Sequence, residues 1–200
     1  MKFWRYYIYN IVYWPVWVVM GIWHFHRFSG RENVPEGPAV VCCNHSGLAD
    51  PVWAVLVMHD RIVPWIMAKK SVVETPVLGA FLRGWGAFGV DRDHADLEAV
   101  KKSLRVLRDG EKLLIFPEGT RMREGKQVAP KSGAVMIANR AGVPLLPVYI
   151  SPRKYPFQKM RCVVGQPYTP QLSGKRPSPE ELNRATEELM QKIYRLGEEQ

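Results

Sequence analysis

Two segments of this 200-residue chain carry the residue types and spacing that acid–base chemistry needs, and the first is the sequence NHSGLAD at residues 44–50. His45 can act as a general base, because the unperturbed pKa of a histidine side chain lies near physiological pH. Asp50 can accept a hydrogen bond from one ring nitrogen, which fixes the tautomer and stabilises the imidazolium form. The pair predicts a catalytic site. A surface histidine followed by a helix cap is the alternative for such a pattern.

The sequence offers no obvious protein nucleophile beside this pair. Ser46 follows His45 directly, but adjacency in sequence does not by itself let the two side chains meet. No G-x-S-x-G elbow occurs anywhere in the chain. A histidine and a carboxylate without an enzyme nucleophile favour direct attack by a hydroxyl group of the substrate.

The second segment is the sequence FPEGTR at residues 116–121, where an apolar run ends at a proline. Glu118 can accept a hydrogen bond from a substrate hydroxyl or orient a basic residue, and Thr120 lies beside it. Gly119 lets the backbone approach a ligand closely. Arg121 presents a planar fork that suits a pair of phosphate oxygens. An ordinary surface turn with an ion pair is the alternative.

Two more basic residues follow or precede predicted elements. Arg92 comes directly after a predicted strand, and its alternative is a solvated side chain at a helix start that Asp93 caps. Lys131 precedes a predicted helix, whose first backbone N–H groups can meet an anion. Both residues are candidates to bind an anionic group of the substrate.

The elements that position these residues alternate between strand and helix. Apolar or extended runs predict strands at residues 40–43, 62–67, 85–90, 113–116, 145–150 and 161–164. Helices are predicted from Asp50 as N-cap, after Thr75, over residues 94–108 and 131–140, and from the capping box at Ser178. This alternation predicts α/β structure: a single domain over residues 30–200, with a mixed, largely parallel sheet flanked by helices. Ligands of such sheets bind beyond the carboxyl ends of the strands, which is where both polar segments fall.

The first 29 residues differ from the rest of the chain. No charged residue occurs from Tyr6 to Trp23, and eight tryptophan and tyrosine residues fall within the first 23 positions. A helix over this stretch would reach about 27 Å, short of a hydrocarbon core of about 30 Å, and Pro15 would kink it. Because tryptophan and tyrosine prefer the headgroup level, residues 1–29 predict a helical segment that docks in the membrane plane. A tryptophan-rich core helix is the alternative.

The overall composition favours an anionic partner without identifying it. The formal net charge is +9 and the sequence pI is near 9.6, which suits anionic lipid, a phosphorylated substrate or nucleic acid. The aromatic N-terminus suits a membrane, and no nucleic-acid-binding motif is present. The 3 cysteines form neither a disulfide framework nor a zinc pattern, so we expect a reducing compartment.

Four boxes in order resemble the glycerolipid acyltransferase family, most closely its 1-acylglycerol-3-phosphate acyltransferases. The first two are the NH-x4-D box at residues 44–50 and the FPEGTR box at residues 116–121. The segment from Lys70 to Arg92 resembles the family's phosphate-site box, and residues 143–148 resemble its proline-containing fourth box. One such box is common by chance, whereas four at the family's spacing, from about residue 30 to 150, are highly specific.

The resemblance implies a reaction and roles for the residues. His45 would deprotonate the sn-2 hydroxyl of 1-acylglycerol 3-phosphate, which attacks the thioester of acyl-CoA or acyl carrier protein and gives phosphatidic acid. Asp50 would orient His45 and stabilise its charge. The glycerol phosphate would be held by Arg92, Glu118 and Arg121, in a binding site that includes Gly119, Thr120 and Lys131. The resemblance also implies that no metal or organic cofactor is needed. The basic residues Lys2, Arg5 and Arg27 flank the aromatic N-terminal segment and favour the cytoplasmic side, so we expect a peripheral or monotopic protein at the cytoplasmic face of the cell membrane.

Several alternatives remain open from the sequence alone. The acceptor could be glycerol 3-phosphate, another lysolipid or an acyl-amino-acid lipid. A lysophospholipase would release free fatty acid without an acceptor. A non-catalytic basic protein would bind membrane or nucleic acid without acyl transfer. The basic residues Lys101, Lys102, Arg105 and Arg108 form either a solvated helix face or a contact with headgroups or an acidic carrier protein.

Overall fold

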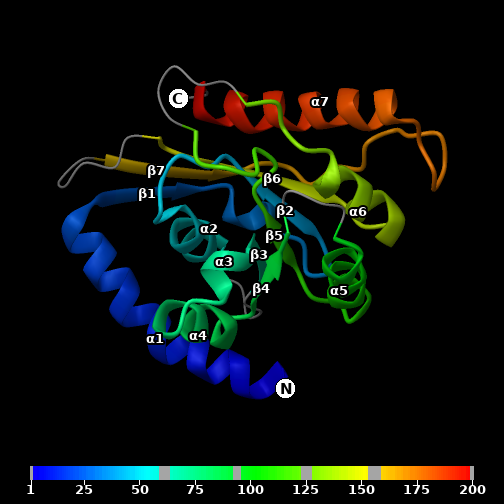
Figure 1. Cartoon of the computed structure of the whole chain (residues 1–200). Helices are drawn as coiled ribbons and strands as arrows, with labels where there is room; N and C mark the ends of the chain where they lie inside the picture. The colour runs from blue at the N-terminus through cyan, green and yellow to red at the C-terminus, as the bar shows by residue number, and fades with distance from the viewer. Residues whose placement is uncertain (1, 59–63, 92–95, 123–127, 153–158, 199–200) are drawn as a thin grey trace.

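The protein forms an α/β structure around one sheet (Figure 1). The structure, a computed structural model, describes residues 2–58, 64–91, 96–122, 128–152 and 159–198. In these residues the sheet has seven strands in the order β1-β7-β6-β2-β5-β3-β4. The strands are β1 (Phe25–Ser29), β2 (Val40–Cys43), β3 (Trp65–Lys69), β4 (Ala87–Val90), β5 (Leu113–Ile115), β6 (Leu145–Ile150) and β7 (Lys159–Val164). Neighbours are parallel except β6 and β7, so the prediction of a mixed, largely parallel sheet is confirmed.

Helices cover both faces of the sheet. They are α1 (Lys2–Trp23), η1 (Arg31–Asn33), α2 (Asp50–Met58), α3 (Lys70–Val73), α4 (Val77–Gly84), α5 (Leu97–Arg108), α6 (Gly133–Ala141) and α7 (Pro179–Glu198). One apolar core lies between the sheet and α1 and α2, and the other lies between the sheet and α5, α6 and α7 (Figure 1). Successive residues of β2 enter opposite cores, Val41 and Cys43 the first, Val40 and Cys42 the second. Burial on both faces explains why this strand reads as an unbroken apolar run.

Local signals fixed several element ends. Ser178 and Glu181 form the predicted capping box, because Glu181 N–H donates to Ser178 Oγ at 3.2 Å and Ser178 N–H donates to Glu181 Oε2 at 2.9 Å. Thr75 Oγ1 accepts the Gly79 N–H at 2.9 Å, which agrees with its predicted role at the start of α4. The helix predicted to start near residue 94 starts at Leu97, since the cap is Asp96, whose Oδ1 accepts the Ala99 N–H at 2.9 Å. The predicted alternative cap, Asp93, lies outside the described residues.

Two strands differ most from prediction, whereas the bounds of β4, β5 and β7 differ by one or two residues. The run predicted at residues 62–67 forms a strand over Trp65–Lys69, and its residues 62 and 63 lie outside the described part of the chain. The segment Phe25–Ser29, predicted to belong to the membrane-docking segment, is the edge strand β1, parallel to β7. Its exposure alternates, with His26 and Phe28 facing inward. The helical part of the N-terminus therefore ends at Trp23 rather than residue 29.

Helix α1 is a single helix that runs through Pro15. Tyr13 is buried in the first core, and Val16, Trp17 and Met20 pack against it. The opposite side of the helix exposes Ile11, Trp14, Val18, Val19 and Ile22. Among the described residues, none of the helices has both the length and the apolar character that crossing a membrane requires.

Candidate active site

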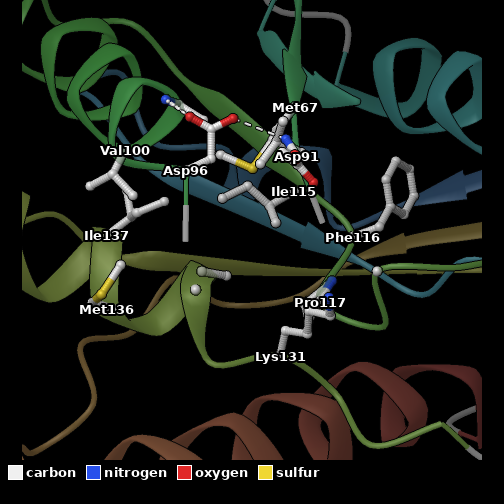
Figure 2. Close-up of a pocket in the computed structure, with 15 residues that line it drawn as sticks. Met67, Asp91, Asp96, Val100, Ile115, Phe116, Pro117, Lys131, Met136 and Ile137 are labelled. Carbon is white, nitrogen blue, oxygen red and sulfur yellow. Dashed lines mark hydrogen bonds between the residues drawn. The ribbon is translucent and has the colours of Figure 1, made fainter. Parts of the chain in front are cut away.

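The carboxyl ends of β3, β4 and β5 and the start of α6 line a cavity of about 290 Å³ (Figure 2). Its wall is mostly apolar and includes Met67, Val90, Val100, Ile115, Met136 and Ile137. Phe116, Gly119 and Lys131 also line it, so the cavity shares residues with the FPEGTR segment. The Phe116 ring lies against the His45 ring, with centroids 4.3 Å apart. The cavity therefore begins one side chain away from the histidine.

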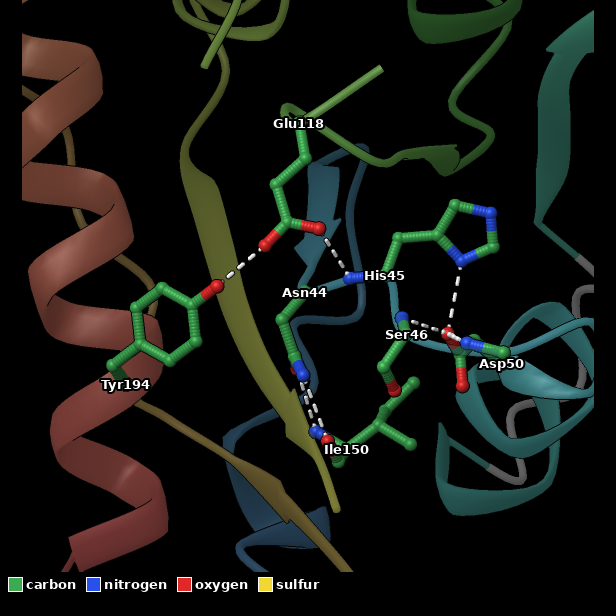
Figure 3. Close-up of polar contacts among 8 residues, drawn as sticks. Asn44, His45, Ser46, Asp50, Glu118, Ile150 and Tyr194 are labelled. Carbon is green, nitrogen blue, oxygen red and sulfur yellow. Dashed lines mark hydrogen bonds and ion pairs between the residues drawn. The ribbon is translucent and has the colours of Figure 1, made fainter. Parts of the chain in front are cut away.

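His45 lies just beyond the end of β2, and its ring contacts Asp50. The distance from His45 Nδ1 to Asp50 Oδ2 is 2.9 Å (Figure 3). The Asp50 side chain is fully buried, whereas that of His45 is 14% exposed. Because a carboxylate only accepts, Nδ1 is the protonated nitrogen that donates, and Nε2 keeps the lone pair that can take up a proton. Figure 3 shows Nε2 pointing away from Asp50, so the structure brings the two residues together as a general base requires.

The Asp50 carboxylate also organises the loop before α2. Its Oδ2 accepts the backbone N–H groups of Ser46 at 2.6 Å and Gly47 at 2.7 Å. This differs from the predicted N-cap, since Asp50 is the first residue inside α2 and these hydrogen bonds run back to the preceding loop. An N-cap would instead accept from N–H groups further along the helix. The result is a closed loop in which the partner of His45 cannot rotate away without losing two backbone contacts.

Asn44 anchors the residue before the histidine. Its side-chain Nδ2 donates to the Ile150 carbonyl at 2.8 Å, and its Oδ1 accepts the Ile150 N–H at 2.8 Å. The amide thus continues the pairing between β2 and β6 by one position after β2 has ended. Sequence reasoning gave Asn44 no role. A buried amide at a strand end has to find partners for both of its polar atoms, and that requirement was the available signal.

Glu118 lies behind His45 with both carboxylate oxygens engaged. Oε2 accepts the backbone N–H of His45 at 2.7 Å, and Oε1 accepts the hydroxyl of Tyr194 at 2.5 Å (Figure 3). Glu118 is 3% exposed. Burial raises the pKa of Glu118, and the hydrogen bonds from Tyr194 and His45 oppose that rise. This position suits the orientation of His45, which is one of the two predicted roles of Glu118, and the contact with an acceptor hydroxyl stays a prediction.

The other predicted binding residues lie on the turn after β5 and before α6. Gly119 has a φ of 66°, a conformation that favours glycine, and the Lys131 side chain passes over it. Lys131 N–H donates to the Pro117 carbonyl at 2.7 Å, which closes this turn. Thr120, Arg121 and Lys131 are exposed. Arg92 lies outside the described residues, so its role stays a prediction.

The cysteines take no part in this site. Cys42, Cys43 and Cys162 are free and fully buried. Burial raises the pKa of the Cys42 and Cys43 thiols, which keeps them protonated and unreactive at neutral pH. Within the described residues, no cluster of three or more histidine, cysteine, aspartate or glutamate side chains could hold a metal ion.

Comparison with known proteins identifies the family. The sequence model of the Acyltransferase family matches residues 26–151, which include both polar segments. The chain belongs to this family. The match ends before α7. Glu118 of this acyltransferase therefore lies inside the segment that defines the family, whereas Tyr194, which donates a hydrogen bond to it, lies outside.

Individual relatives agree with that assignment. The 1-acyl-sn-glycerol-3-phosphate acyltransferase of Bacillus subtilis is 35% identical over 85% of this chain and 87% of its own length. The chloroplastic 1-acyl-sn-glycerol-3-phosphate acyltransferase BAT2 of Brassica napus is 27% identical over 66% of this chain, which spans 40% of that relative. The crystal structure of the 1-acyl-sn-glycerophosphate (LPA) acyltransferase PlsC from Thermotoga maritima has a TM-score of 0.73 and 24% identity, over 96% of this acyltransferase and 81% of that chain. The structural match confirms the fold.

Proposed function

We propose that the protein transfers a fatty acyl group from a thioester donor to the sn-2 hydroxyl of 1-acylglycerol 3-phosphate, with His45 as the general base. The observation that carries this proposal is the 2.9 Å contact between His45 Nδ1 and the fully buried Asp50 carboxylate. It leaves Nε2 as the nitrogen that accepts a proton at the carboxyl edge of the sheet, beside an apolar cavity. The relatives named as 1-acyl-sn-glycerol-3-phosphate acyltransferases support this choice of acceptor.

The reaction follows from this geometry. Nε2 of His45 takes the proton of the acceptor hydroxyl while the hydroxyl oxygen bonds to the thioester carbonyl carbon. Asp50 stabilises the imidazolium that results. The tetrahedral intermediate then expels the thiolate, which takes the proton back from Nε2. The products are phosphatidic acid and the free thiol of the donor, and the enzyme returns to its starting state. Because a thioester is already activated, positioning and one base can suffice.

Charge and shape near His45 support an acceptor that carries a phosphate and an acyl chain. Arg121 and Lys131 are exposed cations, the Lys131 side chain passes over Gly119, and we propose that a phosphate binds between the two cations. The cavity of about 290 Å³ is lined mainly by apolar side chains, and it lies near the lower end of the range of about 300–1,000 Å³ seen for ligand pockets. We assign it to part of a fatty acyl chain. Arg92 stays a further candidate for the phosphate.

The exposed side of α1 supports a position on the membrane surface. Ile11, Trp14, Val18 and Ile22 recur at intervals of three or four residues and therefore form one apolar stripe along the helix. The net charge of +9 favours an anionic lipid surface. We propose a peripheral or monotopic protein on the cytoplasmic face of the membrane, where the acceptor lipid is reached without leaving the bilayer.

The activity is tested with purified protein, lipid vesicles, 1-acylglycerol 3-phosphate and either acyl-CoA or acyl carrier protein loaded with the acyl group. Mass spectrometry should detect phosphatidic acid with at least one donor. His45→Ala should lower kcat by about 10²–10⁴-fold, because the base is lost. His45→Asn, which keeps a donor toward Asp50 but cannot take up the proton, should be equally impaired.

Circular dichroism and thermal melting of both variants separate loss of the base from loss of the fold. If folded His45→Ala retains nearly full activity, the mechanism is wrong. Release of free fatty acid without an acceptor would favour a lysophospholipase. Salt-sensitive DNA binding without acyl transfer would favour a non-catalytic basic protein. A panel of acceptors, including glycerol 3-phosphate and lysolipids with larger headgroups, decides the acceptor class.

A further inference from the structure

The C-terminal helix brings a tyrosine to the carboxylate that holds His45. Tyr194 of α7 donates its hydroxyl to Glu118 Oε1 at 2.5 Å, and Glu118 Oε2 accepts the His45 N–H at 2.7 Å (Figure 3). The Tyr194 side chain is 42% exposed, whereas Glu118 is 3% exposed. The tyrosine therefore reaches inward from the surface and ends on a buried carboxylate. A continuous chain of hydrogen bonds connects α7 to the backbone of the catalytic histidine.

The last turn of α7 is fixed to the sheet, so the position of Tyr194 is defined. The Arg161 guanidinium on β7 donates to the carbonyls of Gly197 at 3.1 Å and Leu196 at 3.3 Å. The backbone of Gly197 lies so close to the Tyr149 ring on β6 that an added Cβ would come within 2.5 Å of it. Ile193, the neighbour of Tyr194, is fully buried in the second core. These contacts hold the hydroxyl of Tyr194 over Glu118.

The backbone of His45 depends on the segment that Glu118 belongs to. Its N–H donates to Glu118, and its carbonyl accepts the Met122 N–H at 2.7 Å. Both backbone polar groups of His45 are thus hydrogen-bonded to residues just after β5. A rotation of the Glu118 side chain would break the hydrogen bond to the His45 N–H. Tyr194 occupies the oxygen of Glu118 that points away from His45, and so opposes this rotation.

We propose that Tyr194 is a positioning residue for acyl transfer, which fixes Glu118 and through it the backbone of His45. This inference rests on the proposed function, since it requires His45 to act as the base. Displacement of a catalytic group by about 1 Å can cost about 100-fold in rate, so a hydrogen bond two residues removed from the chemistry can matter. Burial raises the pKa of Glu118 and the Tyr194 hydrogen bond opposes that rise, so the tyrosine also helps keep both oxygens available as acceptors. The charges of His45 and Asp50 also act on the pKa of this carboxyl group.

The test is Tyr194→Phe, which removes the hydroxyl and keeps the ring. We expect kcat to fall by about 10- to 100-fold, with the KM values for acceptor and donor changed by less than about twofold, because the substrate contacts stay. Tyr149→Phe is the matched control. It removes the same hydroxyl from a tyrosine of β6 whose ring packs against the last turn of α7, and activity should stay at the wild-type level. Thermal melting should place both variants within a few degrees of each other.

Hydrogen exchange followed by mass spectrometry gives a readout that is independent of turnover. A peptide that includes His45 should exchange its amide hydrogens faster in Tyr194→Phe than in wild type and Tyr149→Phe. Unchanged kcat, or a lower kcat without faster exchange at His45, would overturn the inference while an active wild type upholds the proposed function. A folded wild type that forms no phosphatidic acid would overturn the proposed function, and the inference with it.

Discussion

At the scale of single residues, one oxygen atom organises the loop that follows β2. Asp50 Oδ2 accepts from the His45 ring, the Ser46 N–H and the Gly47 N–H. Because all three hydrogen bonds converge on one atom, the carbonyl oxygen of an asparagine could keep them all. Substitution by asparagine would then remove the negative charge and leave the loop in place. The charge of the carboxylate and its placement of the histidine can therefore be separated.

We predict that Asp50→Asn lowers kcat by about 10–100-fold and that Asp50→Ala lowers it by about 10³-fold or more. The first loses the charge that stabilises the imidazolium, and the second also releases the loop. Steady-state kinetics with phosphatidic acid as the detected product distinguish the two. Equal losses in two folded variants would mean that placement contributes nothing beyond charge. Full activity of Asp50→Asn would mean that the charge is not used.

How far the site could be predicted depends on how local each residue's partner is. His45 and Asp50 lie within one loop, so their spacing alone predicts that they meet. Glu118 was found as a site residue, but its contact with His45 spans 73 positions and depends on the neighbouring places of β2 and β5 in the sheet. Tyr194 lies 76 positions from Glu118 on a helix whose pattern shows only an apolar stripe. Nothing in the local sequence of that helix marks its tyrosine as functional.

At the scale of elements, α7 is held on the sheet by a close approach that only a glycine allows. The backbone of Gly197 would place a Cβ 2.5 Å from the Tyr149 ring, a distance at which either the helix or the ring has to move. Gly84, at the end of α4, offers the contrasting case, because a Cβ there would meet nothing within 4 Å. The two positions allow the same substitution with opposite steric consequences.

We therefore predict that Gly197→Ala destabilises the protein by about 1–3 kcal/mol through overpacking, although alanine is the better helix former. Gly84→Ala should be neutral or stabilising by up to about 1 kcal/mol. Thermal or urea unfolding of each variant measures this difference. If Gly197→Ala unfolds at or above the wild-type midpoint, the close packing of α7 on β6 is wrong.

Elements with local end signals were predictable, and those set by distant pairing were less so. The capping box of α7 and the strands Val40–Cys43 and Leu145–Ile150 were found at their observed positions. Strand β1 was missed, because its aromatic sequence continues the composition of α1. Its strand character comes from pairing with β7, whose residues lie 134 positions further along the chain. Pairing with so distant a strand leaves no local signal in a five-residue sequence.

At the scale of the whole molecule, the proposed membrane face is the exposed stripe of α1. Ile22 of that stripe is 66% exposed, and Leu97 at the start of α5, the helix on the other side of the sheet, is 67% exposed. We predict that Ile22→Glu weakens binding to vesicles of phosphatidylcholine and phosphatidylglycerol by about tenfold or more, the size expected when one apolar side chain is no longer buried. Leu97→Glu, the same change in charge at equal exposure, should bind like wild type. Vesicle flotation measures both. Equal loss in the two variants would indicate attraction by net charge alone, without insertion of α1.

The burial of all three cysteine side chains has a practical consequence for such measurements. Cys42, Cys43 and Cys162 are fully buried, and burial raises the pKa of the Cys42 and Cys43 thiols, so maleimide and similar reagents should leave the folded chain unlabelled. A single cysteine introduced on the exterior would then be the one reactive position, without any prior replacement of the native residues. Fluorophores or spin probes attached along α1 could report immersion depth residue by residue in an otherwise wild-type background.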